Sequence, residues 1–338
     1  MPKETLSASK IKVLQSCSWL YWCKYILRLP DTTNSGAQKG EIVHLVFECL
    51  GNPRHRGHFD KILKSPKGVA ASKSVKRLIA KHISKKGLND EDRKDVYDMI
   101  KKGLLIDFWG EKYGKPTEVL SEKSFEFEIC EKDVCYKIKG FIDKLFIYKD
   151  KGLILIRDFK TNKKKYDGKE VTDNLQDNIY TVAIKKLYPQ YSDIQMEFLF
   201  LKQEKEEDVL LSMAAKSRHE ISGFEYELTE YQKYADSFDQ KLALSNLAAN
   251  QKFPTDGSFC GPLLCAFAKY PGQKKKDGSL MWYCSFKFGF ECFFLLNEDG
   301  KVVKSSFNKQ DLEKERKKGQ KIVHRRYKGC PKFKNVGH

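Results

Sequence analysis

The sequence lacks the features that mark membrane and secreted proteins. No segment approaches the roughly 18 consecutive apolar residues that a membrane-spanning helix needs. The first twelve residues contain no apolar core of the kind found in secretory signal peptides. No internal repeat is present, so a repeat architecture is not expected. We therefore expect an intracellular, cytoplasmic protein with a globular fold.

Acidic residues are scarce relative to basic ones. The 338 residues include 63 Lys and Arg but only 45 Asp and Glu, which gives a net charge of +18 at pH 7. Such an excess favours a polyanionic partner, because each neutralised phosphate releases a counterion. An anionic membrane surface is the competing interpretation. The hydrophobic share of 41% and the aromatic share of 12% indicate a folded chain rather than a disordered one.

The ten cysteines would suggest disulfides in a secreted chain. Without a signal peptide, metal or cluster ligation is the better interpretation of those that group together. We interpret Cys23, Cys49, Cys130, Cys135 and Cys292 as core residues, since a free cysteine packs like a small hydrophobe.

Hydrophobic periodicity predicts an α/β core. Strands are expected at 119–129, 135–148, 153–160, 195–201 and 223–228. Helices are expected at 6–29, 38–50, 69–113, 172–188 and 229–251, with a flexible segment at 51–68.

The character of the chain changes after residue 254, where Gly, Cys and Lys become frequent. A hairpin over 286–307, a charged helix over 309–318 and a basic tail are expected there. We therefore expect a core over 1–253, with a helical insertion at about 52–118, and a cysteine-bearing C-terminal region over 254–338.

Two carboxylates and one amine fall near the ends of adjacent predicted strands. Asp158 and Lys160 are two residues apart, so their side chains point to the same face of a strand, and Asp143 on the neighbouring strand can face them. This arrangement is costly unless a divalent cation or an anionic substrate binds there. Carboxylates are hard ligands for Mg²⁺ or Mn²⁺, and Lys160 would position or help to deprotonate a water that attacks a phosphodiester.

These residues also carry a resemblance. Asp143…Asp158-Phe159-Lys160 resembles the D…(D/E)XK signature of PD-(D/E)XK nucleases. Three further motifs resemble the RecB-like branch of that superfamily, which includes the RecB and AddB nuclease domains and the CRISPR adaptation nucleases. These motifs are Gly40-xxx-His44-xxx-Glu48, Gln176-xxx-Tyr180, and an N-terminal segment from Ser7 to Cys17. Each motif alone is ordinary, but the ordered set is fairly specific.

The resemblance implies a restriction-endonuclease-like α/β fold, with a mixed central sheet flanked by helices, and a metal-dependent DNA nuclease. The catalytic residues that it implies are His44, Asp143, Asp158, Lys160, Gln176 and Tyr180, of which the first three would bind Mg²⁺ or Mn²⁺. By analogy with the branch, exonuclease action on a DNA end or single strand is expected. Replication, recombination or repair would be the setting, with a helicase or recombination protein as a further partner and a viral or bacterial origin.

Part of the branch holds a 4Fe–4S cluster through one early and three late cysteines. The resemblance therefore makes five cysteines candidate ligands, namely Cys17, Cys260, Cys265, Cys284 and Cys330. Their spacing departs from the family's tight C-xx-C-x5-C-P pattern. A zinc site that includes Cys260, Cys265 and Cys284 is the second option, and the absence of any metal at the cysteines is the third.

The basic run Lys163-Lys164-Lys165 follows the predicted catalytic strand directly. Further basic runs occur at 274–276 and 314–326, with tyrosines among the charges. This mixture suits a single-stranded nucleic acid, and a plain solvated surface is the alternative for each run.

Two rival functions remain open at this point. One is a nucleic-acid-binding protein that has lost catalysis, and the other is a zinc-stabilised interaction module. DNA and RNA are not distinguished by these patterns.

Overall fold

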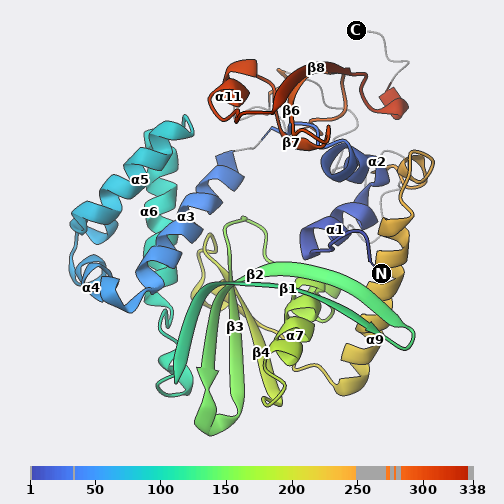
Figure 1. Ribbon diagram of the computed structural model, residues 1–338. Coiled ribbons are helices and arrows are strands. Elements are labelled where there is room, and N and C mark those ends of the chain that lie inside the picture. The colour runs from blue at the N-terminus through green and yellow to red at the C-terminus, as the bar shows by residue number, and fades with distance from the viewer. Residues whose placement is uncertain (1, 33–34, 249–271, 275–277, 279–282, 334–338) are drawn as a thin grey trace. The chain divides into compact units, whose positions relative to one another are not determined.

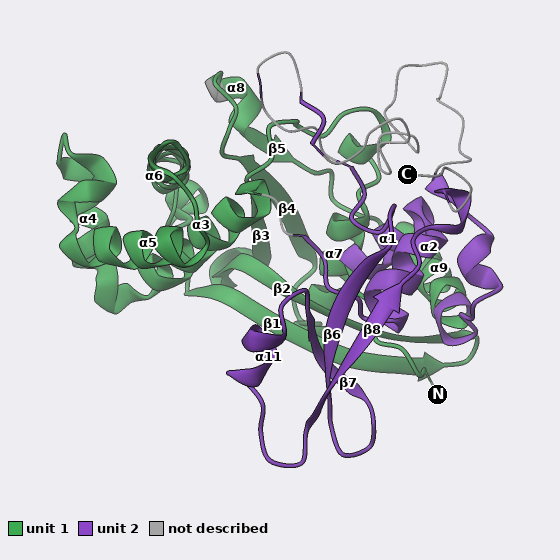
Figure 2. Cartoon of the chain, turned by 90° about the horizontal axis from the view of Figure 1, so that it is seen from above, with its two compact units in different colours: residues 1–8, 33–233 green, residues 9–32, 234–338 purple. Residues whose placement is uncertain are grey.

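The computed structural model describes residues 2–32, 35–248, 272–274, 278 and 283–333. They form two compact units (Figure 2): unit 1 comprises residues 1–8 and 33–233, and unit 2 comprises residues 9–32 and 234–338. Unit 2 thus combines an N-terminal segment with the C-terminal region. The functional boundary that we place at residue 253 stays a prediction.

A five-stranded mixed sheet forms the centre of unit 1 (Figure 1). In spatial order its strands are β1 (Glu118–Glu131), β2 (Val134–Tyr148), β3 (Leu153–Lys160), β4 (Asp193–Phe200) and β5 (Leu210–Ser212). Neighbours are antiparallel except β3 and β4, which run parallel and are joined by helix α7 (Leu175–Leu187). The predicted α/β fold class is confirmed, and so are the first four predicted strands.

Strand β3 lies in the middle of this sheet, as its composition favours. Its first seven residues are all buried, and they include the branched apolar run from Leu153 to Ile156. A strand that is covered on both faces has this character. The edge strand β1 instead exposes charged side chains, which oppose pairing with another chain. The polar residues Arg157 and Asp158 of β3 are therefore buried at the centre of unit 1.

Four longer helices precede the sheet in unit 1. They are α3 (Ser35–Gly51), α4 (Arg56–Lys64), α5 (Lys73–Lys85) and α6 (Asp90–Leu105). Each buries apolar residues in one cluster that also includes Phe159 of β3. The prediction of a flexible segment at 51–68 is wrong, because Phe59 and Ile62 anchor α4 in this cluster.

Side-chain caps explain where α5 and α6 begin. Ser72 accepts a hydrogen bond from the backbone N–H of Val75, and Asn89 forms a capping box with Asp92. The helical segment predicted over 69–113 is therefore interrupted between the two helices. No helix in the described part of the chain is long and apolar enough to cross a membrane.

Unit 2 contains short N-terminal helices and a three-stranded antiparallel sheet. The helical segments are α1 (Ala8–Ser16), α2 (Ser18–Tyr21) and a π-helical turn over Trp22–Ile26. The strands are β6 (Phe290–Leu296), β7 (Val302–Ser306) and β8 (Lys321–Tyr327), in the order β7-β6-β8, and α11 (Lys309–Glu313) precedes β8. The hairpin predicted over 286–307 is confirmed. The single helix predicted over 6–29 is wrong, because the extended backbone of Cys17 separates α1 from α2.

Helix α9 (Arg218–Asp236) differs most from the sequence prediction. Residues 223–228 are predicted as a strand but lie in the middle of this helix. Thr229 and Gln232, on one face of it, accept hydrogen bonds from backbone N–H groups of β2. The helix thus satisfies polar groups of a neighbouring strand, a contact that apolar periodicity does not report.

Candidate active site

Asp143 lies on β2 at the point where its pairing with β3 ends. The ladder between the two strands stops at Lys144 and Arg157. Beyond it, Oδ2 of Asp143 accepts a 2.7 Å hydrogen bond from the backbone N–H of Phe159. The carboxylate replaces a backbone acceptor, and only 10% of the side chain is exposed. Asp143 is therefore held against β3, beside the residue that follows Asp158.

Asp158 and Lys160 form a close, buried ion pair on one face of β3. Nζ of Lys160 lies 2.7 Å from Oδ2 of Asp158. Their common direction follows from the two-residue repeat of a strand. Two buried opposite charges in contact are tolerated when additional hydrogen bonds satisfy them, and Gln176 supplies these bonds.

The side-chain amide of Gln176 connects Asp158, Lys160 and Tyr180. Its Oε1 accepts a hydrogen bond from Nζ of Lys160, while its Nε2 donates to Oδ1 of Asp158 and to the Tyr180 hydroxyl. The Tyr180 hydroxyl in turn donates to the backbone oxygen of Phe141 in β2. Residues four apart lie on the same face of a helix. The Gln176-xxx-Tyr180 spacing therefore lets both side chains reach β2 and β3.

Asn174 determines where α7 begins. Its side-chain oxygen accepts hydrogen bonds from the backbone N–H groups of Gln176 and Asp177, which caps the helix. Buried Asp177 forms a 3.0 Å ion pair with Lys216. These contacts fix the first turn of α7 and, with it, the position of Gln176.

His44 of α3 and Glu122 of β1 form a second group with Asp143. Nδ1 of His44 lies 3.2 Å from Oδ1 of Asp143 and 3.9 Å from Oε1 of Glu122. One ligand atom from each of the three residues lies within 4.8 Å of the other two. An imidazole nitrogen and hard carboxylate oxygens at this spacing can bind a divalent cation.

Two glycines let α3 approach the sheet and bring His44 to the site. A Cβ atom at Gly40 would lie 2.8 Å from Oγ1 of Thr161, the residue that follows Lys160. A Cβ atom at Gly51 would lie 2.2 Å from Oγ of Ser121. Both distances are too short for a real contact, so the glycine that begins the Gly40-xxx-His44 motif has a steric role.

The surrounding carboxylates change the proton affinity of His44. Burial lowers the pKa of the imidazole, but the hydrogen bond with Asp143 and the charge of Asp143 outweigh burial and raise the pKa to about 9. Burial and the charge of Asp143 raise the pKa of Glu122 to about 7, against the influence of His44. At neutral pH a proton on His44 thus supplies the positive charge that a cation would otherwise provide.

Lys160 keeps its charge in this environment. Burial lowers its pKa, but the Asp158 carboxylate outweighs burial and raises the pKa above its ordinary value. Burial also raises the pKa of Asp158, against the charge of Lys160. Lys160 is therefore an ammonium group, which can donate hydrogen bonds and stabilise negative charge rather than accept a proton.

Glu122 is a site residue that the sequence motifs do not reveal. It lies in β1 between the paired residues Ser121 and Lys123, at a position where the β1–β2 ladder is interrupted, and has a φ of 49°, in the left-handed region. A non-glycine residue there costs of order 1–3 kcal/mol, and such residues concentrate at functional sites. Several other glutamates occur in β1, so no local pattern distinguishes this one. Glu48, which ends the predicted motif on α3, is exposed and raises the pKa of Glu122 through its charge.

The predicted nucleic-acid-binding run at 163–165 follows β3 outside any helix or strand. Lys164 forms a 3.0 Å ion pair with Asp167, and Lys165 forms a 3.2 Å ion pair with Asp208. Lys163 is exposed. Two of the three charges are thus partly neutralised, and the binding role of the run stays a prediction.

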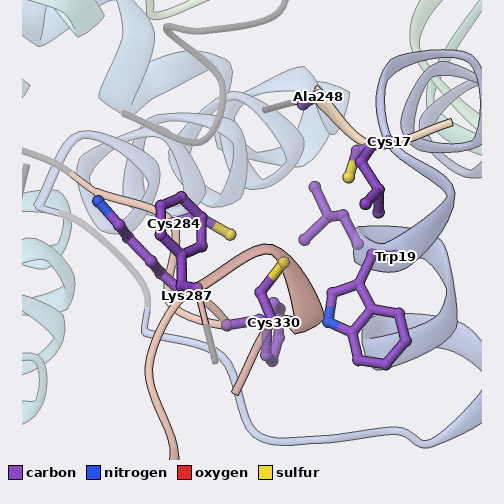
Figure 3. Close-up of a pocket in the computed structure, with 10 residues that line it drawn as sticks. Cys17, Trp19, Ala248, Cys284, Lys287 and Cys330 are labelled. Atoms are coloured by element: carbon purple, nitrogen blue, oxygen red, sulfur yellow. The ribbon is translucent and has the colours of Figure 1, made fainter. Parts of the chain in front are cut away.

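Three of the five candidate cluster cysteines line one pocket in unit 2 (Figure 3). Figure 3 shows the sulfur atoms of Cys284 and Cys330 directed into the same space, with Cys17 across from them. The other residues of the pocket are mostly apolar: Trp19, Leu20, Leu247, Ala248, Phe286, Lys287 and Phe333. Cys260 and Cys265 lie outside the described residues.

The remaining cysteines divide into two groups. Cys23 and Cys292 are fully buried, which confirms their interpretation as core residues, and Cys49 is half-buried. The interpretation is wrong for Cys130 and Cys135. These two residues face each other across the β1–β2 hairpin and form a disulfide, with Cα atoms 4.1 Å apart.

The chain is similar to a family of known proteins. The chain matches the family model described as the PD-(D/E)XK nuclease superfamily over residues 5–270. Solved structures with detectable similarity include a protein from Eubacterium rectale that carries a provisional exonuclease designation, at 12% identity and a TM-score of 0.40, covering 69% of this chain and 82% of that one. They also include SSO0001, at 10% identity and a TM-score of 0.30, covering 70% and 78%. No curated protein sequence matches. Because the family match spans most of the chain and includes every residue of the site in unit 1, the chain belongs to the PD-(D/E)XK nuclease superfamily.

Proposed function

We propose that this protein is a Mg²⁺- or Mn²⁺-dependent DNA nuclease of the RecB-like branch. The observation that carries the proposal is the meeting of α3, β2, β3 and α7 at one site, where an imidazole, two carboxylates, an ammonium and an amide contact one another. In this proposal the catalytic residues are His44, Asp143, Asp158, Lys160, Gln176 and Tyr180.

The donor atoms fit a divalent cation. His44, Asp143 and Asp158 would hold the ion, and Glu122 would be a further ligand, because one of its carboxylate oxygens lies within 4.8 Å of donor atoms of His44 and Asp143. Such an ion, when bound, lowers the pKa of a water and neutralises charge on the scissile phosphate. To act as a ligand, His44 would have to lose its proton.

The other residues support the reaction as donors and as a rigid frame. The Lys160 ammonium positions the attacking water and stabilises the negative charge that develops on the phosphate. Asp158 and Gln176 hold that ammonium in place, and Tyr180 fixes Gln176 through its own bond to β2. These contacts matter, because displacing a catalytic group by about 1 Å can lower the reaction rate by about 100-fold.

We further propose exonuclease action on DNA ends or single strands, in replication, recombination or repair, with a helicase or recombination protein as a partner. The order of the motifs from His44 to Tyr180 supports this step by its resemblance to RecB-like nucleases. The test compares linear and circular single-stranded DNA of one sequence, incubated with Mn²⁺ and either wild type or Asp158→Asn.

We expect wild type to degrade the linear strand and to spare the circle, and the variant to degrade neither. Equal cleavage of the circle by wild type would contradict the requirement for an end. No cleavage of either substrate would instead favour a nucleic-acid-binding protein without catalysis.

We also propose that Cys17, Cys284 and Cys330, together with Cys260 or Cys265, bind a 4Fe–4S cluster. Four sulfurs of a tetrahedral zinc site lie about 3.8 Å apart, because Zn–S bonds are about 2.3 Å long. The sulfur atoms of the three described cysteines do not all lie within 4.8 Å of one another. The three thiols that line one mostly apolar pocket support a shared cluster.

The visible absorption and metal content of protein purified without oxygen test this proposal. We expect a visible absorption band near about 400 nm, typical of iron–sulfur charge transfer, and bound iron. Cys17→Ser should lose both, while the control Cys292→Ser, which alters a buried cysteine of β6, should keep both. Zinc without iron in wild type would contradict the proposal.

A further inference from the structure

The segment between α3 and α6 concentrates positive charge. Residues 52–88 contain eleven Lys and Arg residues and a single acidic residue, Asp60. This excess exceeds half of the chain's net charge of +18. The segment belongs entirely to unit 1, which also contains the candidate active site.

Helix α5 presents part of this charge as a continuous row, which we call the α5 stripe. The stripe consists of Lys73, Arg77, Lys81 and Lys85. Residues at four-residue intervals lie on one face of a helix, and all four side chains are exposed. The buried residues Val75, Ile79 and Ile83 belong to the apolar cluster, so packing fixes which face the helix turns outward. The stripe extends over about 18 Å, at 1.5 Å per residue.

No carboxylate in the described part of the chain forms an ion pair with the stripe. The helix itself contains no acidic residue. Each neighbouring pair in the stripe places like charges at i and i+4, which destabilises a helix. In contrast, Lys39 of α3 is held between Asp92 and Asp95. A rigid row of cations that is unfavourable for its own helix indicates a polyanion outside the chain.

We infer that the α5 stripe binds the phosphate backbone of the DNA substrate, outside the catalytic centre. The identity of the ligand rests on the proposed function. Helix α5 packs against α3, the helix that carries His44, so bound phosphates would have a fixed position relative to the site (Figure 1). Lys and Arg contacts to phosphate position a nucleic acid without reading its bases, so this binding is independent of sequence and sensitive to salt.

The test replaces all four stripe residues with Gln, whose helix propensity is close to that of Lys and Arg. A matched control replaces four other exposed lysines of unit 1 with Gln: Lys115, Lys132, Lys149 and Lys151. Both sets are made with Asp158→Asn, so that DNA binds without being cleaved. Circular dichroism and melting temperature verify the fold of each variant, and we expect the stripe variant to melt no earlier than its parent, because like-charge repulsion is removed.

Binding of fluorescent DNA is measured by anisotropy over a series of salt concentrations. We expect the stripe variant to bind of order 100-fold more weakly than its parent at low salt. The slope of log K against log salt should become smaller by about 3 to 4, since each lost phosphate contact contributes about 0.9. The control should change affinity by less than about threefold. With Asp158 intact, the stripe substitutions should raise KM and leave kcat unchanged.

Equal affinity and equal salt slope in the stripe variant and the control would overturn the inference. So would a loss of binding to phosphatidylserine vesicles while DNA binding stays intact, because the stripe would then recognise a membrane surface. A wild type that binds DNA through the stripe but does not cleave it would contradict the proposed function and leave this inference standing.

Discussion

The backbone N–H of Phe159 donates a 2.7 Å hydrogen bond to Oδ2 of Asp143, and this bond joins β3 to β2 where their ladder ends. The same carboxylate lies 3.2 Å from Nδ1 of His44 through its other oxygen. Asp143 therefore has a structural role on one oxygen and an expected ligand role on the other, and substitution can separate the two.

Asp143→Asn keeps an acceptor for Phe159 but loses the negative charge. We expect a loss of cleavage of about 100-fold or more, because an ion contributes several kcal/mol to the transition state, and some loss of stability at neutral pH, because protonated His44 loses its partner charge. Asp143→Ala should in addition cost about 1–3 kcal/mol of stability, since it leaves a backbone N–H without its partner. Urea unfolding and single-turnover cleavage measure both effects. Equal unfolding curves for the Asn and Ala variants would contradict the structural role.

Gln176→Ala removes the amide that orients Lys160. Asp158 and Lys160 remain paired, so we expect a stable protein whose cleavage rate falls by about 10- to 100-fold, as for other supporting residues of active sites. Asn178→Ala provides a control on the same helix, because Asn178 bonds to Asp173 rather than to the site. If Gln176→Ala cleaves DNA as fast as this control, the amide has no catalytic role.

Gly40→Ala tests the close approach of α3 to the sheet. The new methyl group would meet Oγ1 of Thr161 at 2.8 Å, so we expect α3 to shift and His44 to lose its distance to Asp143. Expressed as free energies, the loss of activity should exceed the loss of stability. The reason is that alanine stabilises a helix by up to about 1 kcal/mol relative to glycine, which offsets part of the cost of the clash. Adding Thr161→Ala removes the clash and should restore part of the cleavage rate in a double-mutant cycle. Additive effects of the two substitutions would exclude this contact as the cause.

The affinity for Mn²⁺ should rise with pH. The carboxylates around His44 raise its pKa to about 9 in the metal-free protein, and a ligand imidazole must be neutral. Below that pH each binding event releases the His44 proton, so the apparent Kd should fall by up to about tenfold per pH unit and level off above about pH 9. Calorimetry in buffers of different ionisation enthalpy measures both Kd and proton release. His44→Gln should bind more weakly and with a flatter pH profile, and a wild-type Kd that does not depend on pH would contradict this assignment.

We expect the free energy of unfolding to depend on pH because of Lys144. It is fully buried, its Nζ donates to the backbone oxygen of Phe108, and burial with the nearby charge of Arg157 lowers its pKa to about 6. An unfolded chain holds this proton up to about pH 10.4. Between these values the unfolded state binds more protons, so the free energy of unfolding of wild type rises with pH. Lys144→Met lacks this dependence, and its stability advantage over wild type should be larger at pH 6 than at pH 9. An advantage that is equal at both pH values would mean that Lys144 keeps its proton when folded.

Local spacing explains why much of this fold and site could be predicted. The direction shared by Asp158 and Lys160 follows from the strand repeat, and the face shared by Gln176 and Tyr180 follows from the helix repeat. Strands β1 and β3 could also be predicted, β1 from its alternating polar and apolar residues and β3 from its continuous apolar run.

The missed features depend on contacts between segments that are distant in the sequence or on the conformation of single residues. Glu122 belongs to the site because its own backbone is in the left-handed region and because α3 approaches the sheet. No local sequence pattern predicts either feature. Helix α9 is favoured by hydrogen bonds to β2. Cys130 and Cys135 flank a hairpin turn, and their pairing depends on the register of the two strands, which the hydrophobic character of cysteine does not indicate.

The position of a bound Mn²⁺ ion tests the central claim most directly. Anomalous scattering from crystals grown with Mn²⁺ locates the ion without reference to activity. We predict an ion at bonding distance, about 2.0–2.3 Å, from a nitrogen of His44 and a carboxylate oxygen of Asp143, with Asp158 beside it. An ion held only by other residues, or no ion at millimolar Mn²⁺, would contradict the account.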